Sequence, residues 1–386
     1  MKILAVTGIR SDYDILHPVL TELEKAGHDL FIAVSGAHLS DSHDNTWKRV
    51  ESDGFQIVDK IDTLLSTDRV VQRSKGVGLL IQGLTQTTER LNPDFLLVVG
   101  DREESISAAI VGNYMNKLVI HIGGGDPVFG NADDPVRFAV SKLAHVHCCI
   151  AEDYKQNLIR LGEEEFRIFF TGNPAYANID SVPRTTRENI YQKIGLSSEK
   201  YIVLIKHPLS SEVEASGRQI KSILEALQTF CEQHKYQVVC IPPNSDPGSY
   251  KIRQEINKYR QKDWLIVSET LERLEFINLM RNATTLIGNS SMGILEAPHY
   301  KLPVINVGNR QMGRLNAGNV EFVSYAIDDI MSSLAKACFD ESYRLHIQSI
   351  NNPYGDGTAA KKIRTAIESV NTSDSKWYVK QKLCLS

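Results

Sequence analysis

The sequence predicts an α/β protein built from two doubly wound, Rossmann-like domains that face each other across a cleft. Its 386 residues exceed what one ordinary core organises, so two domains of roughly 150 to 200 residues are expected. The apolar runs are nearly continuous over five to eight residues, as in strands that are buried on both faces. Segments with helical periodicity alternate with these runs, which indicates parallel sheets covered by helices.

The first half of the chain alternates strands and helices from its N-terminus. Strands are expected at 2–8, 29–36, 94–101 and 117–124. Helices are expected at 14–27, 76–93, 105–116 and 134–145, and the first of them ends on a glycine suited to a C-cap. We therefore predict a first domain over residues 1–175.

The second half repeats this alternation without repeating the sequence. Strands are expected at 200–208, 236–243, 264–269, 284–291 and 302–308, with helices that include 218–234 and 273–283. Residues 174–200 lose the strand pattern and carry prolines, so the crossover between the domains is placed there. The second domain is predicted to span 176–364, and a closing helix with a tail, 365–386, is predicted to reach back to the first domain.

Charge and composition exclude several classes of protein. A formal net charge of -4 at pH 7 supplies no overall basic field for a nucleic acid, so any bound anion must be held locally. No apolar segment approaches the length of a membrane span, and the first strand is too short for a secretory signal, which predicts a cytoplasmic protein. The six cysteines show no CxxC spacing and are expected to be reduced.

Open parallel sheets bind ligands at the carboxyl ends of their strands, so the candidate site residues are those that follow the predicted strands. Arg10 follows the first strand, where an arginine pairs with a phosphate or with a structural carboxylate. Asp101 follows the strand at 94–101, where it either faces a substrate or caps the helix that starts near Glu104. Both alternatives stay open at this point.

The segment HIGGGDPVFGNADDPVRFAVSKLAH, residues 121–145, carries Asp126, Asp133, Asp134 and Arg137. Its glycines allow close approach of the backbone to a ligand, but they do not spell GxGxxG, and the carboxylates would repel a diphosphate. We therefore reject a phosphate-binding loop here. One of the two consecutive aspartates is expected to cap the following helix, which leaves the other for chemistry.

The second domain offers groups suited to a diphosphate. His207 follows a strand in IKHPLSSE, where a histidine is either structural or part of a site. In LIGNSSMGILEAP a strand runs through a Gly-Asn-Ser-Ser turn into a helix start, so Ser290, Ser291 and backbone N–H groups would bind phosphate. Glu296 would accept hydrogen bonds from a ribose. The turn is not a GxSxG nucleophile elbow, which argues against a serine hydrolase.

Together these motifs resemble the UDP-N-acetylglucosamine 2-epimerase family, specifically its hydrolysing branch. The resemblance runs in order through most of the chain, as TGIRSDY, VVGDREE, HIGGGD, DDPVRFAVSKLAH, TGNPAYANID, KHPLSSE, PNSDPGS, GNSSMGILEAP and INVGNRQMGR. It implies the two-domain GT-B fold and a homodimer or homotetramer. It also implies conversion of UDP-GlcNAc and water into N-acetylmannosamine and UDP, through loss of the C2 proton, departure of UDP to give a glycal, and addition of water.

The resemblance also implies roles for particular residues. Asp101 and one of the pair Asp133 and Asp134 would be acid/base groups at the sugar, and Asp126 is a further catalytic candidate, in the glycine-rich loop. The diphosphate and ribose would be held by residues of both domains, and the uracil would lie near an aromatic ring; these residues are Arg10, Arg137, His207, Phe276, Ser290, Ser291 and Glu296. No cofactor and no metal are implied, because the carboxylates lack a metal-ligand spacing.

Gly123 departs from the family pattern, since many relatives carry a glutamate or histidine there. A glycine transfers no proton, so either Asp126 takes over, or the essential acid lies elsewhere, or the substrate differs. A roomier loop would suit a UDP-linked 2,4-diacetamido-2,4,6-trideoxyhexose, as used in legionaminic acid pathways, and this is the alternative substrate. A GT-B glycosyltransferase and a silent nucleotide-sugar sensor are the further alternatives.

Overall fold

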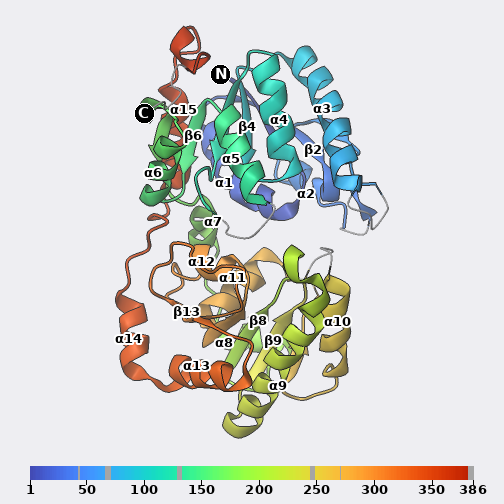
Figure 1. Cartoon of the computed structure of the whole chain (residues 1–386), viewed down its shortest axis with the longest axis vertical. Coiled ribbons are helices and arrows are strands. Elements are labelled where there is room, and N and C mark those ends of the chain that lie inside the picture. The colour runs from blue at the N-terminus through green and yellow to red at the C-terminus, as the bar shows by residue number, and fades with distance from the viewer. Residues whose placement is uncertain (42–43, 66–70, 128–132, 244–247, 270, 381–386) are drawn as a thin grey trace. The chain divides into compact units, whose positions relative to one another are not determined.

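A computed structural model describes residues 1–41, 44–65, 71–127, 133–243, 248–269 and 271–380. The chain forms two compact units (Figure 1). Among the described residues, the first unit contains 1–127, 133–178 and 354–380, and the second contains 179–353. The chain thus leaves the first unit after residue 178 and returns to it at Tyr354.

The first unit is built on a parallel sheet of seven strands in the order β3-β2-β1-β4-β5-β6-β7. The strands are β1 (Lys2–Thr7), β2 (Asp29–Ser35), β3 (Ile57–Ile61), β4 (Phe95–Val99), β5 (Leu118–Ile122), β6 (Val146–Cys149) and β7 (Ile168–Phe170). The central strands are mostly apolar because both faces of the sheet are covered; the exceptions are Lys2 and Thr7 at the ends of β1 and His121 in β5. The strand order reverses between β1 and β4, which is where such sheets bind ligands.

Helices cover both faces of this sheet. They are α1 (Arg10–Lys25), α2 (Trp47–Ser52), α3 (Val71–Leu91), α4 (Glu103–Tyr114), α5 (Asp133–Leu143), α6 (Glu152–Arg160), the start of α7 (Ala175–Ser181) and α15 (Ala359–Glu368). One core contains Leu16 of α1 and Ile363 of α15, and the core on the other face contains Ala108 of α4. The returning C-terminal segment is therefore part of the first unit's core (Figure 1).

The second unit repeats the plan with a parallel sheet of six strands in the order β10-β9-β8-β11-β12-β13. The strands are β8 (Tyr201–Ile205), β9 (Gln237–Ile241), β10 (Leu265–Val267), β11 (Thr285–Gly288), β12 (Val304–Val307) and β13 (Val320–Val323). The helices are α8 (Arg187–Ile194), α9 (Ser216–His234), α10 (Ser249–Lys258), α11 (Arg273–Asn282), α12 (Met292–Leu295), α13 (Ile327–Phe339) and α14 (Glu341–Ser349). The order of its strands reverses between β8 and β11.

The predicted pair of doubly wound parallel sheets is confirmed. The predicted strands of the first half correspond to β1, β2, β4 and β5, and those of the second half to β8 through β12. The structure adds β3, β6, β7 and β13, which the sequence patterns had not indicated. The described cysteines are buried and form no disulfide.

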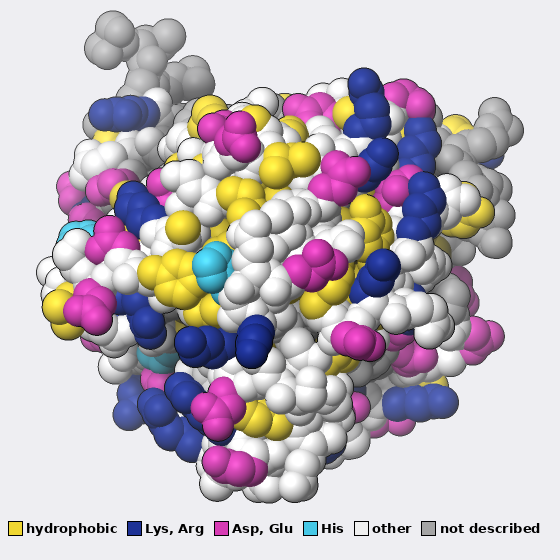
Figure 2. Space-filling model, turned by 90° about the horizontal axis from the view of Figure 1, so that it is seen from below, with side chains coloured by type: hydrophobic (Ala, Val, Ile, Leu, Met, Phe, Trp, Pro, Cys, Tyr) yellow, Lys and Arg dark blue, Asp and Glu magenta, His cyan; other side chains and the backbone are white. Residues whose placement is uncertain are grey.

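The surface carries charges of both signs. Figure 2 shows one face on which Lys and Arg, Asp and Glu, and hydrophobic side chains are all exposed. None of the helices in the described part of the chain has the length and apolar character needed to cross a membrane.

Candidate active site

Asp101 lies at the carboxyl end of β4, next to the switch point of the first sheet. Gly100 precedes it with φ of 72°, a left-handed conformation that glycine adopts without strain. The N-cap of α4 is Arg102, with no side-chain cap, so the structure excludes the alternative that Asp101 caps this helix. The Asp101 carboxylate instead accepts a hydrogen bond from the Arg137 guanidinium.

Arg137 joins Asp101 to Asp126. Its Nη1 lies 2.8 Å from Asp126 Oδ2 and donates to the Asp126 carbonyl at 2.9 Å. The side chain of Asp126 is 2% exposed, whereas that of Asp101 is 18% exposed. Burial alone would lower the pKa of Arg137, but the two carboxylates outweigh burial and raise it, so the guanidinium stays charged. A buried cation thus fixes two carboxylates, one of which keeps accessible surface.

His121, on β5, holds the backbone that presents Asp101. Its Nε2 lies 2.7 Å from the carbonyl of Gly100, and its Nδ1 lies 3.2 Å from Ser141 Oγ on α5. Burial lowers the pKa of His121 to about 3, so the ring is neutral. A neutral ring that faces a carbonyl at Nε2 carries its proton there and accepts from Ser141 at Nδ1. This hydrogen-bond chain was not predicted from the sequence.

The three glycines after β5 differ in what they allow. A Cβ on Gly125 would lie 2.4 Å from the Tyr154 carbonyl, and one on Gly124 would lie 2.9 Å from Ser141 Oγ, so both positions are sterically closed. A Cβ on Gly123 would meet nothing within 4 Å, although its φ of 82° favours glycine. Gly124 and Gly125 are thus required by packing, whereas Gly123 leaves open space beside the loop.

Asp133 and Asp134 form the first residues of α5. Their side chains lie outside the described part of the structure, so their acid/base role stays a prediction. Pro135 is in the first turn of α5, where its missing N–H has no intrahelical partner to lose. The helix that carries them also carries Arg137 four residues later than Asp133.

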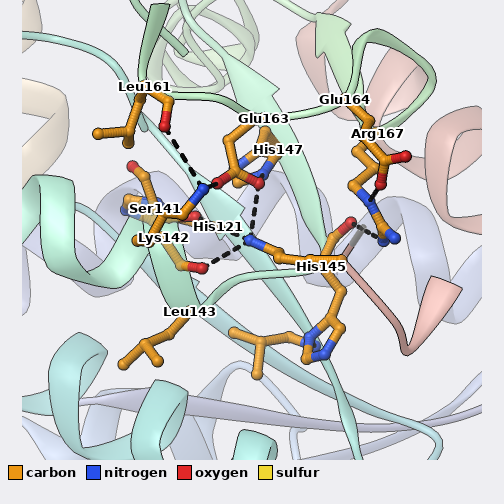
Figure 3. A network of polar contacts seen from close by, with 12 residues as sticks. His121, Ser141, Lys142, Leu143, His145, His147, Leu161, Glu163, Glu164 and Arg167 are labelled. Atoms are coloured by element: carbon orange, nitrogen blue, oxygen red, sulfur yellow. Dashed lines mark hydrogen bonds and ion pairs between the residues drawn. The ribbon is translucent and has the colours of Figure 1, made fainter. Parts of the chain in front are cut away.

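A polar network around the buried carboxylate of Glu163 holds the carboxyl end of α5 (Figure 3). Lys142 Nζ lies 2.9 Å from Glu163 Oε1, and His147 Nε2 lies 3.1 Å from Glu163 Oε2. Lys380, from the C-terminal segment, donates to Glu163 at 2.7 Å and to the Lys142 carbonyl at 2.7 Å. Fully buried Arg167 donates to the Trp377 carbonyl at 2.8 Å. The returning segment therefore helps to fix the helix that carries Arg137.

Arg10 is the half-buried first residue of α1, directly after the turn that ends β1. Beside this turn lies Glu104, which is 4% exposed and accepts from Ser35 Oγ at 3.2 Å. A Cβ on Gly8 would lie 1.8 Å from Glu104 Oε1, so the carboxylate occupies the space that the glycine leaves. Burial, with Glu104 as a further contributor, raises the pKa of Asp12 to about 7. Sequence patterns assigned Glu104 only to a helix start, because its contact with Gly8 joins positions that are far apart in the sequence.

In the second unit, His207 and Asn289 connect the carboxyl ends of β8 and β11. The His207 N–H donates to Asn289 Oδ1 at 2.7 Å, and Asn289 Nδ2 donates to the His207 carbonyl at 2.9 Å. Arg310 Nη1 donates to the Asn289 carbonyl at 2.9 Å. Burial, followed by the charges of Arg310 and Lys206, lowers the pKa of His207 to about 3. A cationic environment thus surrounds the switch point of the second sheet, and Asn289, Lys206 and Arg310 were missed by sequence analysis.

Ser290 and Ser291 follow Asn289 and are half-buried. The expected helix start is present, but α12 has only four residues, Met292–Leu295, and Glu296 is its C-cap rather than a member of a longer helix. The helix stops here because Ala297 is followed by Pro298, whose ring hinders continuation. Tyr300, whose pKa is raised by burial and then by Glu296, lies close to this carboxylate.

Phe276 lies on α11 and packs, half-buried, against the hydrophobic core on one face of the second sheet. Over the described residues, no group of three or more His, Cys, Asp or Glu side chains has the arrangement of a metal site.

Two doubly wound parallel sheets in succession, each with polar groups at its switch point, define a protein of the GT-B fold. The model of the UDP-N-acetylglucosamine 2-epimerase family matches residues 21–368, so the chain belongs to that family and is an enzyme of its kind. A protein from Legionella pneumophila described as "UDP-N,N'-diacetylbacillosamine 2-epimerase (hydrolyzing)" is 35% identical over 371 residues, 96% of each chain.

Two further comparisons agree with this assignment. The "GDP/UDP-N,N'-diacetylbacillosamine 2-epimerase (hydrolyzing)" of Campylobacter jejuni is 31% identical over 374 residues, again 96% of each chain. The crystal structure of UDP-GlcNAc 2-epimerase from Neisseria meningitidis bound to UDP-GlcNAc has a TM-score of 0.83 and covers 96% of this chain and 100% of its own. At 21% identity, that structure bears on the fold alone.

Proposed function

We propose that this enzyme hydrolyses UDP-GlcNAc with inversion at C2, which releases N-acetylmannosamine and UDP. The observation that carries the proposal is the arrangement of Asp101, which is withheld from the α4 N-cap and kept at the strand end by Arg137. Family membership supplies the reaction class. The proposal requires a carboxylate at the sugar and a cationic site for the leaving diphosphate.

The residues divide these tasks in our proposal. Asp101 removes the C2 proton as a general base, and Asp133 or Asp134 is the second acid/base group. Arg137 fixes Asp101 and Asp126. Departure of UDP develops negative charge on the diphosphate, which positively charged and N–H donor groups stabilise. Arg10 and a set of second-unit residues would bind UDP; this set is His207, Phe276, Ser290, Ser291 and Glu296.

A UDP-linked 2,4-diacetamido-2,4,6-trideoxyhexose is the second candidate substrate. Two observations favour this substrate. First, the names of the relatives from Legionella pneumophila and Campylobacter jejuni specify diacetylbacillosamine, a sugar of this class. In addition, the open space at Gly123 would accommodate a second acetamido group. Both candidates lose the same C2 proton and expel the same UDP, so the residue roles are unchanged.

The test is proton NMR of the purified enzyme in D2O with each donor. We expect equimolar UDP and a free manno-configured sugar that carries deuterium at C2, and the ratio of kcat/KM for the two donors identifies the substrate. Asp101→Asn is expected to reduce turnover by about 10²-fold to 10⁴-fold while UDP affinity changes little. Asp29→Asn, at an exposed position on β2, is the matched control. Wild-type turnover in Asp101→Asn would refute the role of this carboxylate.

We further propose that the enzyme acts as a cytoplasmic homodimer or homotetramer in sialic or legionaminic acid synthesis. The free, buried thiols at the described cysteines support a reducing compartment. Light scattering after size-exclusion chromatography tests the oligomeric state, and a monomer with full activity would contradict it.

A further inference from the structure

Lys206 is a buried lysine at the end of β8, directly before His207. Its side chain is 1% exposed. Its Nζ donates to the His207 carbonyl at 2.8 Å and to Gln219 Oε1 at 3.1 Å, and both of these acceptors are neutral. Taking an ammonium group out of water is costly unless an anion compensates for the lost hydration. Lys206 therefore sits where a bound anion would stabilise its charged form.

The groups around Lys206 oppose and support its charge unequally. The positive charge of Arg310 disfavours a charged Lys206, whereas the negative charge of Glu212 favours it. Gln219 bridges the two side chains, since it accepts from Lys206 and donates to Glu212 Oε2. The Tyr325 ring centroid lies 5.7 Å from Nζ. Burial, and then Arg310, lower the pKa of Lys206 to about 8, and Glu212 offsets only part of this. His207, the remaining titratable neighbour, is neutral near pH 7 because burial lowers its pKa to about 3.

Lys206 acts on the backbone that forms the switch point of the second sheet. The His207 carbonyl accepts hydrogen bonds from both Lys206 Nζ and Asn289 Nδ2. Asn289 also accepts from the His207 N–H and is followed directly by Ser290. Arg310 binds the carbonyl of the same asparagine. Two cations thus flank one short stretch of backbone, and removal of Lys206 would release one of the bonds that hold it.

We propose that Lys206 is a positioning residue of the nucleotide site, which holds His207 in place and becomes fully protonated when the diphosphate of UDP binds. This inference rests on the proposed function, since it takes UDP as the anion. Lys206 thus has two roles in this proposal: its Nζ holds the His207 carbonyl, and its positive charge favours binding of the diphosphate.

The sign of the linkage follows from the two states. In the free enzyme Lys206 loses its proton as pH rises through about 8. A diphosphate nearby favours the charged form, which raises the pKa of Lys206 in the complex. Between the two values, UDP binding takes up a proton, and UDP affinity falls as pH rises. At pH 8, where half of the free groups are charged, uptake approaches about half a proton per UDP.

The experiment is isothermal titration calorimetry of UDP at pH 7, 8 and 9, in two buffers of different ionisation enthalpy. The difference in observed enthalpy between the buffers gives the number of protons taken up. Lys206→Arg keeps a positive charge that does not titrate in this range, so we expect no proton uptake at pH 8. Lys206→Met is expected to weaken UDP binding by at least about tenfold at pH 7. Lys221→Met, at an exposed position on α9, is the matched control.

Each outcome has one meaning. If the wild-type enzyme binds no UDP at any pH, the proposed function fails and this inference fails with it. If UDP binds without proton uptake at pH 8, or if Lys206→Arg takes up as many protons as the wild type, Lys206 is not linked to the diphosphate, while the proposed function stands. Loss of uptake in Lys206→Arg, with uptake retained in Lys221→Met, supports the inference even if Lys206→Met does not fold.

Discussion

Replacing Glu163 by Gln should destabilise the first unit strongly and in a pH-dependent way. The carboxylate is 1% exposed and lies within 3.1 Å of Lys142, His147 and Lys380. Burial alone would raise the pKa of Glu163, but His147 and Lys380 outweigh burial and lower it from 4.5 to about 2. Each pKa unit corresponds to about 1.4 kcal/mol, so ionised Glu163 contributes about 3 kcal/mol of stability at pH 7.

The direction of the pKa shift of Glu163 determines the pH range over which its contribution to stability is lost. Because the pKa in the folded state lies below that in the unfolded state, the contribution is complete above about pH 4.5 and is lost as pH falls to about 2. The neutral amide of Glu163→Gln makes no such contribution at any pH. Removing one partner of a buried ion pair also costs about 3–5 kcal/mol in general, which agrees with this magnitude.

Urea unfolding followed by tryptophan fluorescence is the assay. In a Trp264→Phe background, all tryptophan emission comes from Trp47 and Trp377, which both lie in the first unit. The wild type should exceed Glu163→Gln by about 3 kcal/mol at pH 7, and the difference should shrink towards pH 2. Exposed Glu165→Gln is the control, with no measurable change expected. A difference that stayed constant between pH 7 and pH 3 would refute the electrostatic argument.

Three further substitutions test other contacts. Gly8→Ala should unfold at a markedly lower temperature in a thermal melt, because its Cβ would lie 1.8 Å from a buried carboxylate oxygen of α4. Gly78→Ala in α3 is the control: its Cβ has free space, so the free energy of unfolding should rise by up to about 1 kcal/mol. His121→Gln should lower kcat about tenfold with UDP affinity retained, and an unchanged kcat would remove His121 from the support of the strand end. Arg167→Met should release the C-terminal segment, so that trypsin cleaves after Lys376 faster than in the wild type, as measured by mass spectrometry.

The fold was largely predictable because its central strands are mostly apolar. β1, β4 and β5 are buried along nearly their whole length, so each appears in the sequence as an apolar run that can be recognised without knowing which strands pair with it. β6 reads Val-His-Cys-Cys, and its His147 is acceptable in the interior only because Glu163, sixteen residues later, pairs with it. Edge strand β13 is only partly buried, so its pattern is weak.

The site divides in the same way. Positions at strand ends, such as Asp101 and His207, follow from the alternation of strands and helices, because carboxyl ends of parallel strands gather at one edge. The residues that these side chains contact do not follow from this alternation. Asn289 reaches His207 across 82 residues of sequence, and Glu104 of α4 meets the turn at Gly8. Such contacts depend on register and side-chain direction, which local sequence patterns leave undetermined.

The contacts of Arg137 distinguish the two aspartates that it binds. A general base has to approach the C2 proton to hydrogen-bond distance, which requires accessible carboxylate surface. Asp101 retains 18% exposure of its side chain, whereas Asp126 is 2% exposed and gives Arg137 both a carboxylate and a carbonyl acceptor. In our proposal Asp126 therefore holds the guanidinium, and the guanidinium in turn orients Asp101. This division would explain how a glycine is tolerated at Gly123, because the proton transfer rests on a carboxylate outside that loop.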